Sequence, residues 1–138
     1  MLKLKVQKAT EFEKNVKATV QSTGRLGFSD GAKKKMKIET GKYLVIATNE
    51  EDSTDENLYA WLEDTADGGG FRINKGGEYY NANTKPLFDG LGIDYKDQEN
   101  LIIYDIIDFN YEGNSIFKFI KRIHTRNKKN KKTGDNDN

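Results

Sequence analysis

The 138-residue chain contains no cysteine and only one histidine, one proline and one tryptophan. The lack of cysteine excludes a disulfide scaffold, a thiol nucleophile and a thiolate metal site. A single histidine, His124, argues against a histidine-based zinc site or a Ser-His triad. No apolar run approaches the roughly 18 residues of a membrane helix, and the first residues do not resemble a signal peptide. We therefore expect a soluble cytoplasmic protein with no cofactor, no metal and no membrane partner.

The charges are segregated along the chain, although the net charge is only +1. Residues 1–48 hold 11 Lys or Arg and 4 Asp or Glu, residues 49–112 hold 4 and 16, and residues 113–138 hold 8 and 2. Two basic ends therefore flank an acidic middle. This distribution suits a basic face that binds a polyanion, and it equally suits ends and middle that neutralise each other in the fold.

The hydrophobic pattern predicts a mostly β protein with two short helices and about nine to eleven strands. The order strand–strand–helix–strand–strand is expected twice, in residues 1–66 and 67–124, and the first unit also includes a strand at the chain's start. Neither unit has enough apolar residues for a core of its own, so we expect one small barrel-like body. Residues 125–138 are basic and lack apolar side chains, which predicts a disordered tail.

Both predicted helices follow residues that favour helix starts. Ser29 or Asp30 is expected to cap the first helix, and Asn83 or Thr84 the second. The second helix has Pro86 in its first turn, where the missing N–H group costs nothing.

Residues 24–43 carry a pattern that is found in one family of DNA-binding domains. Gly24-Arg25-Leu26-Gly27-Phe28-Ser29 precedes a short polar helix, and Met36-Lys37-Ile38-Glu39-Thr40-Gly41-Lys42-Tyr43 follows it. This order resembles the AbrB/MazE/SpoVT group of swapped-hairpin domains, although Ser29 replaces the usual proline and Gly27 lies inside the strand. The resemblance implies two copies that interlock into a dimeric barrel and grip DNA with basic residues. In this chain the second unit would supply the other half, so we expect a monomer or a homodimer.

Basic residues beside the first glycine turn are the leading candidate contacts to DNA. Arg25 follows Gly24, and Lys33, Lys34 and Lys37 lie on the predicted helix, where the first and last share one face. Phosphate contact requires cations on a rigid scaffold, and arginine also reads guanine in the major groove. A lysine-rich helix that is merely solvated is the competing interpretation.

A second candidate group surrounds the turn at Gly76-Gly77. Arg72, Lys75 and Tyr79 combine cations with an aromatic ring, which suits stacking of single-stranded bases. Tyr79 and Tyr80 are adjacent, so in a strand they face opposite ways and only one of them is available for stacking. Tyrosines that simply pack on a sheet surface give the same pattern.

Lys121, Arg122 and Arg126 begin the basic end of the chain and form a third candidate group. Such a tail raises non-specific affinity for nucleic acid, and it equally serves as a solubilising end. No nucleophile, base or set of metal ligands converges anywhere in the sequence, so we expect no enzyme.

These features predict a small DNA-binding protein that acts as a transcriptional regulator. One alternative is a single-stranded nucleic-acid binder, which requires Tyr79 or Tyr80 to be exposed beside Arg72 and Lys75. The other is a protein-interaction or structural module, in which the basic residues pair with the acidic loops and an exposed apolar patch near Trp61 marks the partner surface.

Overall fold

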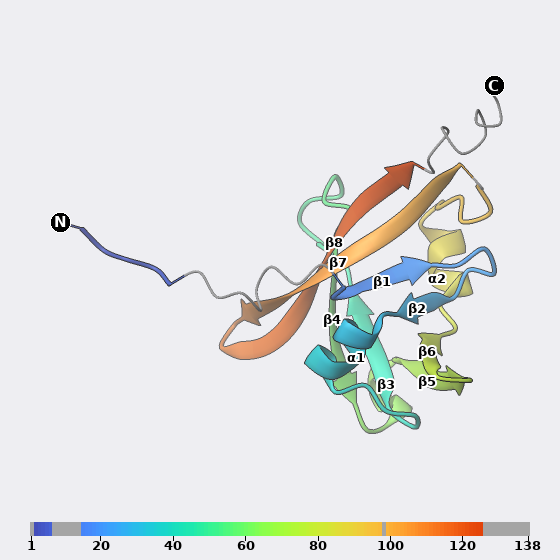
Figure 1. The fold of residues 1–138 in the computed structure, drawn as a ribbon, viewed down its shortest axis with the longest axis horizontal. Coiled ribbons are helices and arrows are strands. Elements are labelled where there is room, and N and C mark those ends of the chain that lie inside the picture. The colour runs from blue at the N-terminus through green and yellow to red at the C-terminus, as the bar shows by residue number, and fades with distance from the viewer. Residues whose placement is uncertain (1, 7–14, 98, 126–138) are drawn as a thin grey trace.

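The computed structural model describes residues 2–6, 15–97 and 99–125, and these contain eight strands, two α-helices and one 3₁₀ helix (Figure 1). In chain order the elements are β1 (Lys17–Val20), β2 (Leu26–Phe28), α1 (Asp30–Met36), β3 (Tyr43–Ala47), β4 (Leu58–Glu63), η2 (Ala66–Gly68), β5 (Phe71–Gly76), β6 (Tyr79–Ala82), α2 (Lys85–Gly90), β7 (Asn100–Tyr111) and β8 (Asn114–Thr125). The predicted mostly β fold with two short helices is confirmed. The described residues form eight strands, fewer than the nine to eleven expected.

The eight strands form one closed ring in which every neighbouring pair is antiparallel. The ring order is β1-β2-β6-β5-β3-β4-β8-β7, and β7 pairs back to β1. The β7–β8 hairpin is the longest, with 12 residues in each strand. Its neighbours β1 and β4 cover only part of that length, so the hairpin extends past them on both sides (Figure 1).

The ring order is unchanged when the first four strands exchange places with the last four. Hairpins β1–β2 and β3–β4 come from the first half of the chain, and hairpins β5–β6 and β7–β8 come from the second. Around the ring these hairpins alternate between the halves. If β1 is exchanged with β5, β2 with β6, β3 with β7 and β4 with β8, the same pairs of strands remain neighbours. The two halves are therefore joined by strand pairing throughout the sheet.

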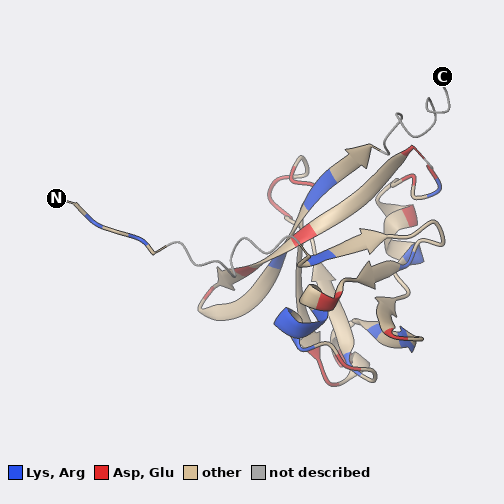
Figure 2. Cartoon of the chain, viewed as in Figure 1, with Lys and Arg blue, Asp and Glu red and all other residues tan. Residues whose placement is uncertain are grey.

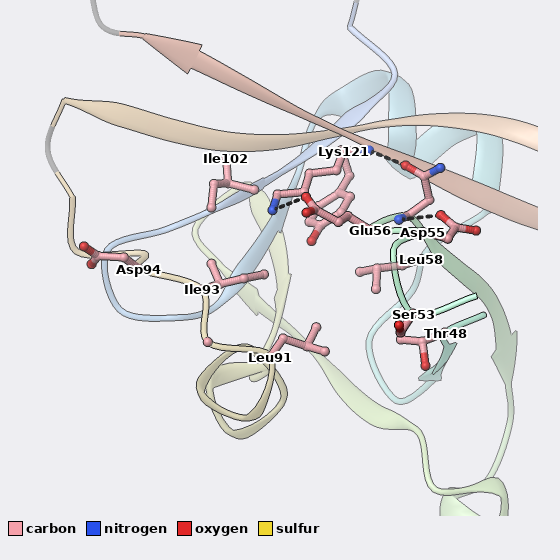
Figure 3. A pocket seen from close by; sticks show the side chains of 13 residues that line it. Thr48, Ser53, Asp55, Glu56, Leu58, Leu91, Ile93, Asp94, Ile102 and Lys121 are labelled. Carbon is pink, nitrogen blue, oxygen red and sulfur yellow. Dashed lines mark hydrogen bonds and ion pairs between the residues drawn. The ribbon is translucent and has the colours of Figure 1, made fainter. Parts of the chain in front are cut away.

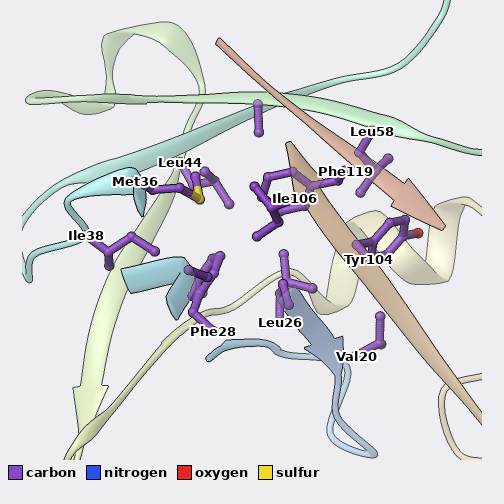
Figure 4. Packing of buried hydrophobic residues seen from close by; sticks show 14 of the residues in the cluster. Val20, Leu26, Phe28, Met36, Ile38, Leu44, Leu58, Tyr104, Ile106 and Phe119 are labelled. Atoms are coloured by element: carbon purple, nitrogen blue, oxygen red, sulfur yellow. The ribbon is translucent and has the colours of Figure 1, made fainter. Parts of the chain in front are cut away.

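One hydrophobic core lies inside the ring and draws on both halves (Figure 4). Tyr104 is fully buried, with its ring 6.3 Å from that of Phe88 and 6.3 Å from that of Phe119, measured between centroids. The first helix contributes Ala32 and Met36, which lie on its buried side, and the second contributes Phe88. Both helices therefore pack against the same core.

Side-chain hydrogen bonds near the two helix starts differ. The hydroxyl of Ser29 accepts hydrogen bonds from the backbone N–H groups of Ala32 and Lys17, at 3.1 Å each, which caps α1 as predicted and ties it to β1. Thr84 precedes α2, but its side chain makes no capping hydrogen bond. Its hydroxyl donates instead to the carbonyl oxygen of Gly24, so a tertiary contact replaces the expected cap.

The predicted strand at the start of the chain is wrong. Residues 2–6 belong to no strand, and Leu2, Leu4 and Val6 are 82%, 82% and 72% exposed. Alternation produces a strand only where a neighbouring strand and a core accept it, and none of the described strands pairs with these residues. At the other end Thr125 belongs to β8, and the rest of the predicted tail, residues 126–138, lies outside the described residues.

Candidate nucleic-acid interface

The outer surface of β2, β6 and β5 brings Arg25 and Arg72 to one part of the molecule. Leu26 and Ile73 both pair with Ala82, and all three side chains are fully buried in the core. Neighbouring positions in a strand point to the opposite face. Arg25 and Arg72 therefore lie on the outer surface, on either side of β6. Two strand spacings place their backbones about 10 Å apart.

Amide side chains lie on the same outer surface. Asn81 of β6 pairs with Gly27 of β2 on one side and with Asn74 of β5 on the other, so the three form one row. The side-chain oxygen of Asn81 is buried and accepts no hydrogen bond from the described residues. The side-chain amide of Gln21 lies over Gly27, in the space that a Cβ atom would need. The glycine inside this strand therefore makes room for a polar side chain.

These amides were missed in the sequence, although their alternation with buried residues along β5 and β6 was a signal that could have found them. Arginine pairs with guanine edges in the major groove, and asparagine or glutamine pairs with adenine edges. The outer surface thus combines side chains that suit both kinds of base contact.

The two adjacent tyrosines of β6 point to opposite sides, as predicted. Tyr79 is 73% exposed and pairs with Gly76, whereas Tyr80 is half-buried and packs against the core. The ammonium groups of Lys33 and Lys75 lie 5.2 and 5.6 Å from the centre of the Tyr80 ring. A cation is attracted to the face of an aromatic ring. The Tyr80 ring therefore binds two candidate cations, Lys33 of α1 and Lys75 of β5.

Carboxylate partners divide the predicted basic residues into two groups. Three are ion-paired: Lys34 with Asp30 (3.2 Å), Lys121 with Glu56 (2.9 Å) and Arg122 with Asp105 (2.6 Å). Within the described part of the chain, no carboxylate lies at ion-pair distance from the other five: Arg25, Lys33, Lys37, Arg72 and Lys75. Arg126 lies outside the described residues. Neutralisation by acidic residues therefore explains Lys34, Lys121 and Arg122, but it does not explain the other five cations.

The structure does not bring Lys121 and Arg122 together with the other candidates. Both lie on β8, which is four strands away from β6 in a ring of eight and therefore on its opposite side. Lys118 of the same strand lies over the rings of Tyr59 and Phe109, at 5.7 and 5.6 Å. Figure 2 shows basic segments on α1 and β5 and a separate one on β8.

Acidic residues of β4 and the segment after it have partners of their own. The ammonium group of Lys42 bonds to Asp64 at 2.8 Å, and this hydrogen bond raises the pKa of Lys42 and lowers the pKa of Asp64. The indole N–H of Trp61 donates to Glu63 at 3.0 Å. Trp61 itself is half-buried, so the exposed patch expected around it is not centred on this side chain.

No protein-family model, curated protein or solved structure matches the chain. In residues 2–6, 15–97 and 99–125, no helix is long and apolar enough to cross a membrane. Function therefore has to be inferred from the side chains and their surroundings.

Proposed function

We propose that this protein binds double-stranded DNA, without catalysis, through α1 and the outer surface of β2, β6 and β5. The observation that carries the proposal is the group of five cations that lack a carboxylate partner among the described residues: Arg25, Lys33, Lys37, Arg72 and Lys75. The whole chain has a net charge of only +1, so these cations are not a by-product of a generally basic protein. Arg25 and Arg72 lie on the outer surface, whereas Lys33 and Lys75 lie together at Tyr80, on the opposite face of β5 and β6. Unneutralised cations attract a polyanion.

The side chains of this surface suit two kinds of DNA contact. Lys33 on α1 and Lys37 just after its last residue supply positive charge for phosphate oxygens, which fixes the position of a protein on the duplex. Arg25, Arg72 and the exposed amides of Gln21 and Asn74 supply donors and acceptors for base edges in the major groove. A protein that both positions itself and reads bases suits a transcriptional regulator, and we include that role and a cytoplasmic location in the proposal.

The exchange property of the ring supports the swapped-hairpin interpretation. The family resemblance implies two copies whose hairpins interlock, and here hairpins from the two halves of one chain alternate around the ring. β2 and β6 hold equivalent positions in the two halves of the chain, and they also pair with each other. The proposed DNA surface therefore lies where the two halves meet, and one chain is sufficient to form it.

Single-stranded nucleic acid is a second candidate ligand, and one observation favours it. Tyr79 is 73% exposed on the outer face of β6, and the neighbouring strand β5 carries Arg72 on this same face. Bases stack on such rings with little sequence preference. The protein-interaction alternative follows if neither form of nucleic acid binds.

The test is fluorescence anisotropy of the full chain with a labelled duplex and its separated strands over a series of salt concentrations. We expect the duplex to bind more tightly and its affinity to fall log-linearly with salt. Arg25→Ala should weaken duplex binding by roughly 5- to 150-fold, the range for loss of one base-reading arginine. Lys118→Ala is the matched control, because it removes a cation that also has no carboxylate partner among the described residues and lies on the opposite side of the ring.

Three other results would change the conclusion. Equal losses in Arg25→Ala and Lys118→Ala would show that only total charge matters. Preferred binding of the single strand, lost in Tyr79→Ala, would favour the second candidate function. Loss of all binding when the chain is ended after Thr125 would assign the activity to residues 126–138.

A further inference from the structure

A pocket of about 400 Å³ lies away from the proposed DNA surface (Figure 3). It is bordered by the loop between β3 and β4, the segment that follows α2, and strands β7 and β8. None of its lining residues belongs to β2, β5 or β6. Its volume falls in the range of sites that hold small molecules.

Apolar side chains form the smaller part of the wall of this pocket, and polar groups form the larger part. Leu58, Leu91, Ile93 and Ile102 line it, and the first and last of these belong to the hydrophobic core. Leu91 is 45% exposed, which is high for a large apolar side chain. The wall thus offers an apolar surface that a bound molecule would cover.

Tyr104 adds a hydroxyl group to the pocket wall. The residue is fully buried and lines the pocket, and its hydroxyl makes no hydrogen bond within the described part of the chain. Burial, followed by the charge of Glu56, raises the pKa of Tyr104 to about 12, so the hydroxyl keeps its proton. Buried polar groups are almost always hydrogen-bonded. A hydroxyl kept beside a pocket without a partner therefore points to a ligand that supplies one.

The lining carries more negative than positive charge. It contains the carboxylates Asp55, Glu56 and Asp94 and a single cation, Lys121. Glu56 already holds the ammonium group of Lys121 at 2.9 Å. Hydrogen bonds, of which the one from Tyr59 is the strongest, lower the pKa of Asp55 to about 2 and keep this carboxylate ionised. The field inside the pocket thus favours a cation and disfavours an anion.

We propose that this pocket binds a small organic amine that has an apolar body and a polar group at its far end. The apolar body packs against Leu58, Ile93 and Ile102, and the ammonium group faces the carboxylates. Asp94 can contribute, because it accepts a hydrogen bond from the backbone N–H of Lys96 but forms no ion pair within the described residues. The polar group at the far end accepts the hydrogen bond of the Tyr104 hydroxyl. This inference does not depend on DNA binding.

Three matched probes test the proposal by NMR titration of the full chain. Tyramine has the ammonium group and a phenol, 2-phenylethylamine lacks only the hydroxyl, and 3-(4-hydroxyphenyl)propionate replaces the ammonium group by a carboxylate. We expect tyramine to shift the amide signals of Leu58, Ile93 and Ile102. It should bind about 2- to 13-fold more tightly than 2-phenylethylamine, the range for one added hydrogen bond. The propionate should bind most weakly.

Two variants assign the effect to named side chains. Tyr104→Phe should abolish the preference for tyramine over 2-phenylethylamine, whereas Tyr111→Phe, which removes an exposed hydroxyl at the tip of the β7–β8 hairpin, should keep it. Asp94→Asn should weaken both amines and strengthen the propionate, because it removes a negative charge that attracts the former and repels the latter. Urea unfolding of Tyr104→Phe provides an independent readout, because loss of an unpartnered hydroxyl should leave stability equal or higher.

Several outcomes would overturn the proposal. Absence of shifts at millimolar tyramine would do so, as would equal binding of the amine and the propionate. A Tyr104→Phe variant that is less stable and still prefers tyramine would show that the hydroxyl has a structural role only. Each of these results would leave the proposed DNA surface unaffected.

Discussion

The hydroxyl of Thr84 donates a hydrogen bond to the carbonyl oxygen of Gly24, 2.9 Å away and 60 residues apart in the sequence. Thr84 is fully buried, and Gly24 has a φ of +85°, which favours glycine. A Cβ atom at Gly24 would also lie 2.9 Å from the side chain of Lys85. The turn that precedes Arg25 is thereby fixed to the start of α2, which belongs to the other half of the chain.

Thr84→Val should lower the free energy of unfolding by about 1–3 kcal/mol, because the buried carbonyl of Gly24 loses its donor while the size of the side chain is kept. Thr84→Ser restores the hydroxyl and serves as the control. Urea denaturation of the two variants measures the difference. Equal stability of the valine and serine variants would show that the hydrogen bond contributes nothing.

Lys37→Gly should raise stability by about 1 kcal/mol while weakening duplex binding. Lys37 ends α1 in the left-handed region, at φ 60°, where a side chain is strained and glycine is not. Lys37→Ala removes the same charge but keeps the strain, so it should weaken DNA binding without the gain in stability. Thermal unfolding and anisotropy of both variants separate the two effects. A glycine variant no more stable than the alanine variant would argue against strain at this position.

Asp55 should titrate far below an ordinary aspartate. Its carboxylate accepts hydrogen bonds from the hydroxyl of Tyr59 (2.7 Å), the backbone N–H of Asn57 (2.9 Å) and the side chain of Asn49 (3.1 Å). These bonds, led by that from Tyr59, lower the pKa of Asp55 from 3.8 to about 2. Because the folded-state pKa is lowered, the stabilisation is present above pH 3.8 and is lost as the pH falls toward 2.

Carbon-detected NMR of the Asp55 carboxyl group measures this midpoint directly. Tyr59→Phe should raise the pKa of Asp55, while Tyr111→Phe should leave it unchanged. A midpoint near 3.8 in the wild-type chain would mean that the loop between β3 and β4 is not held by this carboxylate.

Local patterns predicted most elements of this fold, because local chemistry decides them. Ser29 caps α1 as its position before a short amphipathic run predicts, and Tyr79 and Tyr80 face opposite ways because strand residues alternate. Thr84 had the same signal as Ser29, yet a carbonyl group from the other half of the chain takes its hydroxyl. The order of strands around the ring was not predictable, because it depends on pairings between distant segments.

The sequence shows which residues are basic and could bind DNA, but it does not show which of them form ion pairs with carboxylates. Lys35 bonds to Asp108 and Lys121 to Glu56, partners separated by 73 and 65 residues. Only the closed ring shows which cations meet a carboxylate and which are left without one. The unpartnered hydroxyl of Tyr104 was equally invisible, because a tyrosine in an apolar strand looks like any other core residue.

The most direct test of the proposed function compares the double variant Arg25→Ala/Arg72→Ala with Lys118→Ala in duplex binding across a salt series. If the outer surface of β2, β6 and β5 holds DNA, the double variant should lose at least about 25-fold in affinity, from two contacts of about 1 kcal/mol or more each. Lys118→Ala should bind within about twofold of the wild-type chain, since a cation far from the interface contributes only long-range charge. A double variant that binds the duplex as tightly as Lys118→Ala would contradict the proposed function.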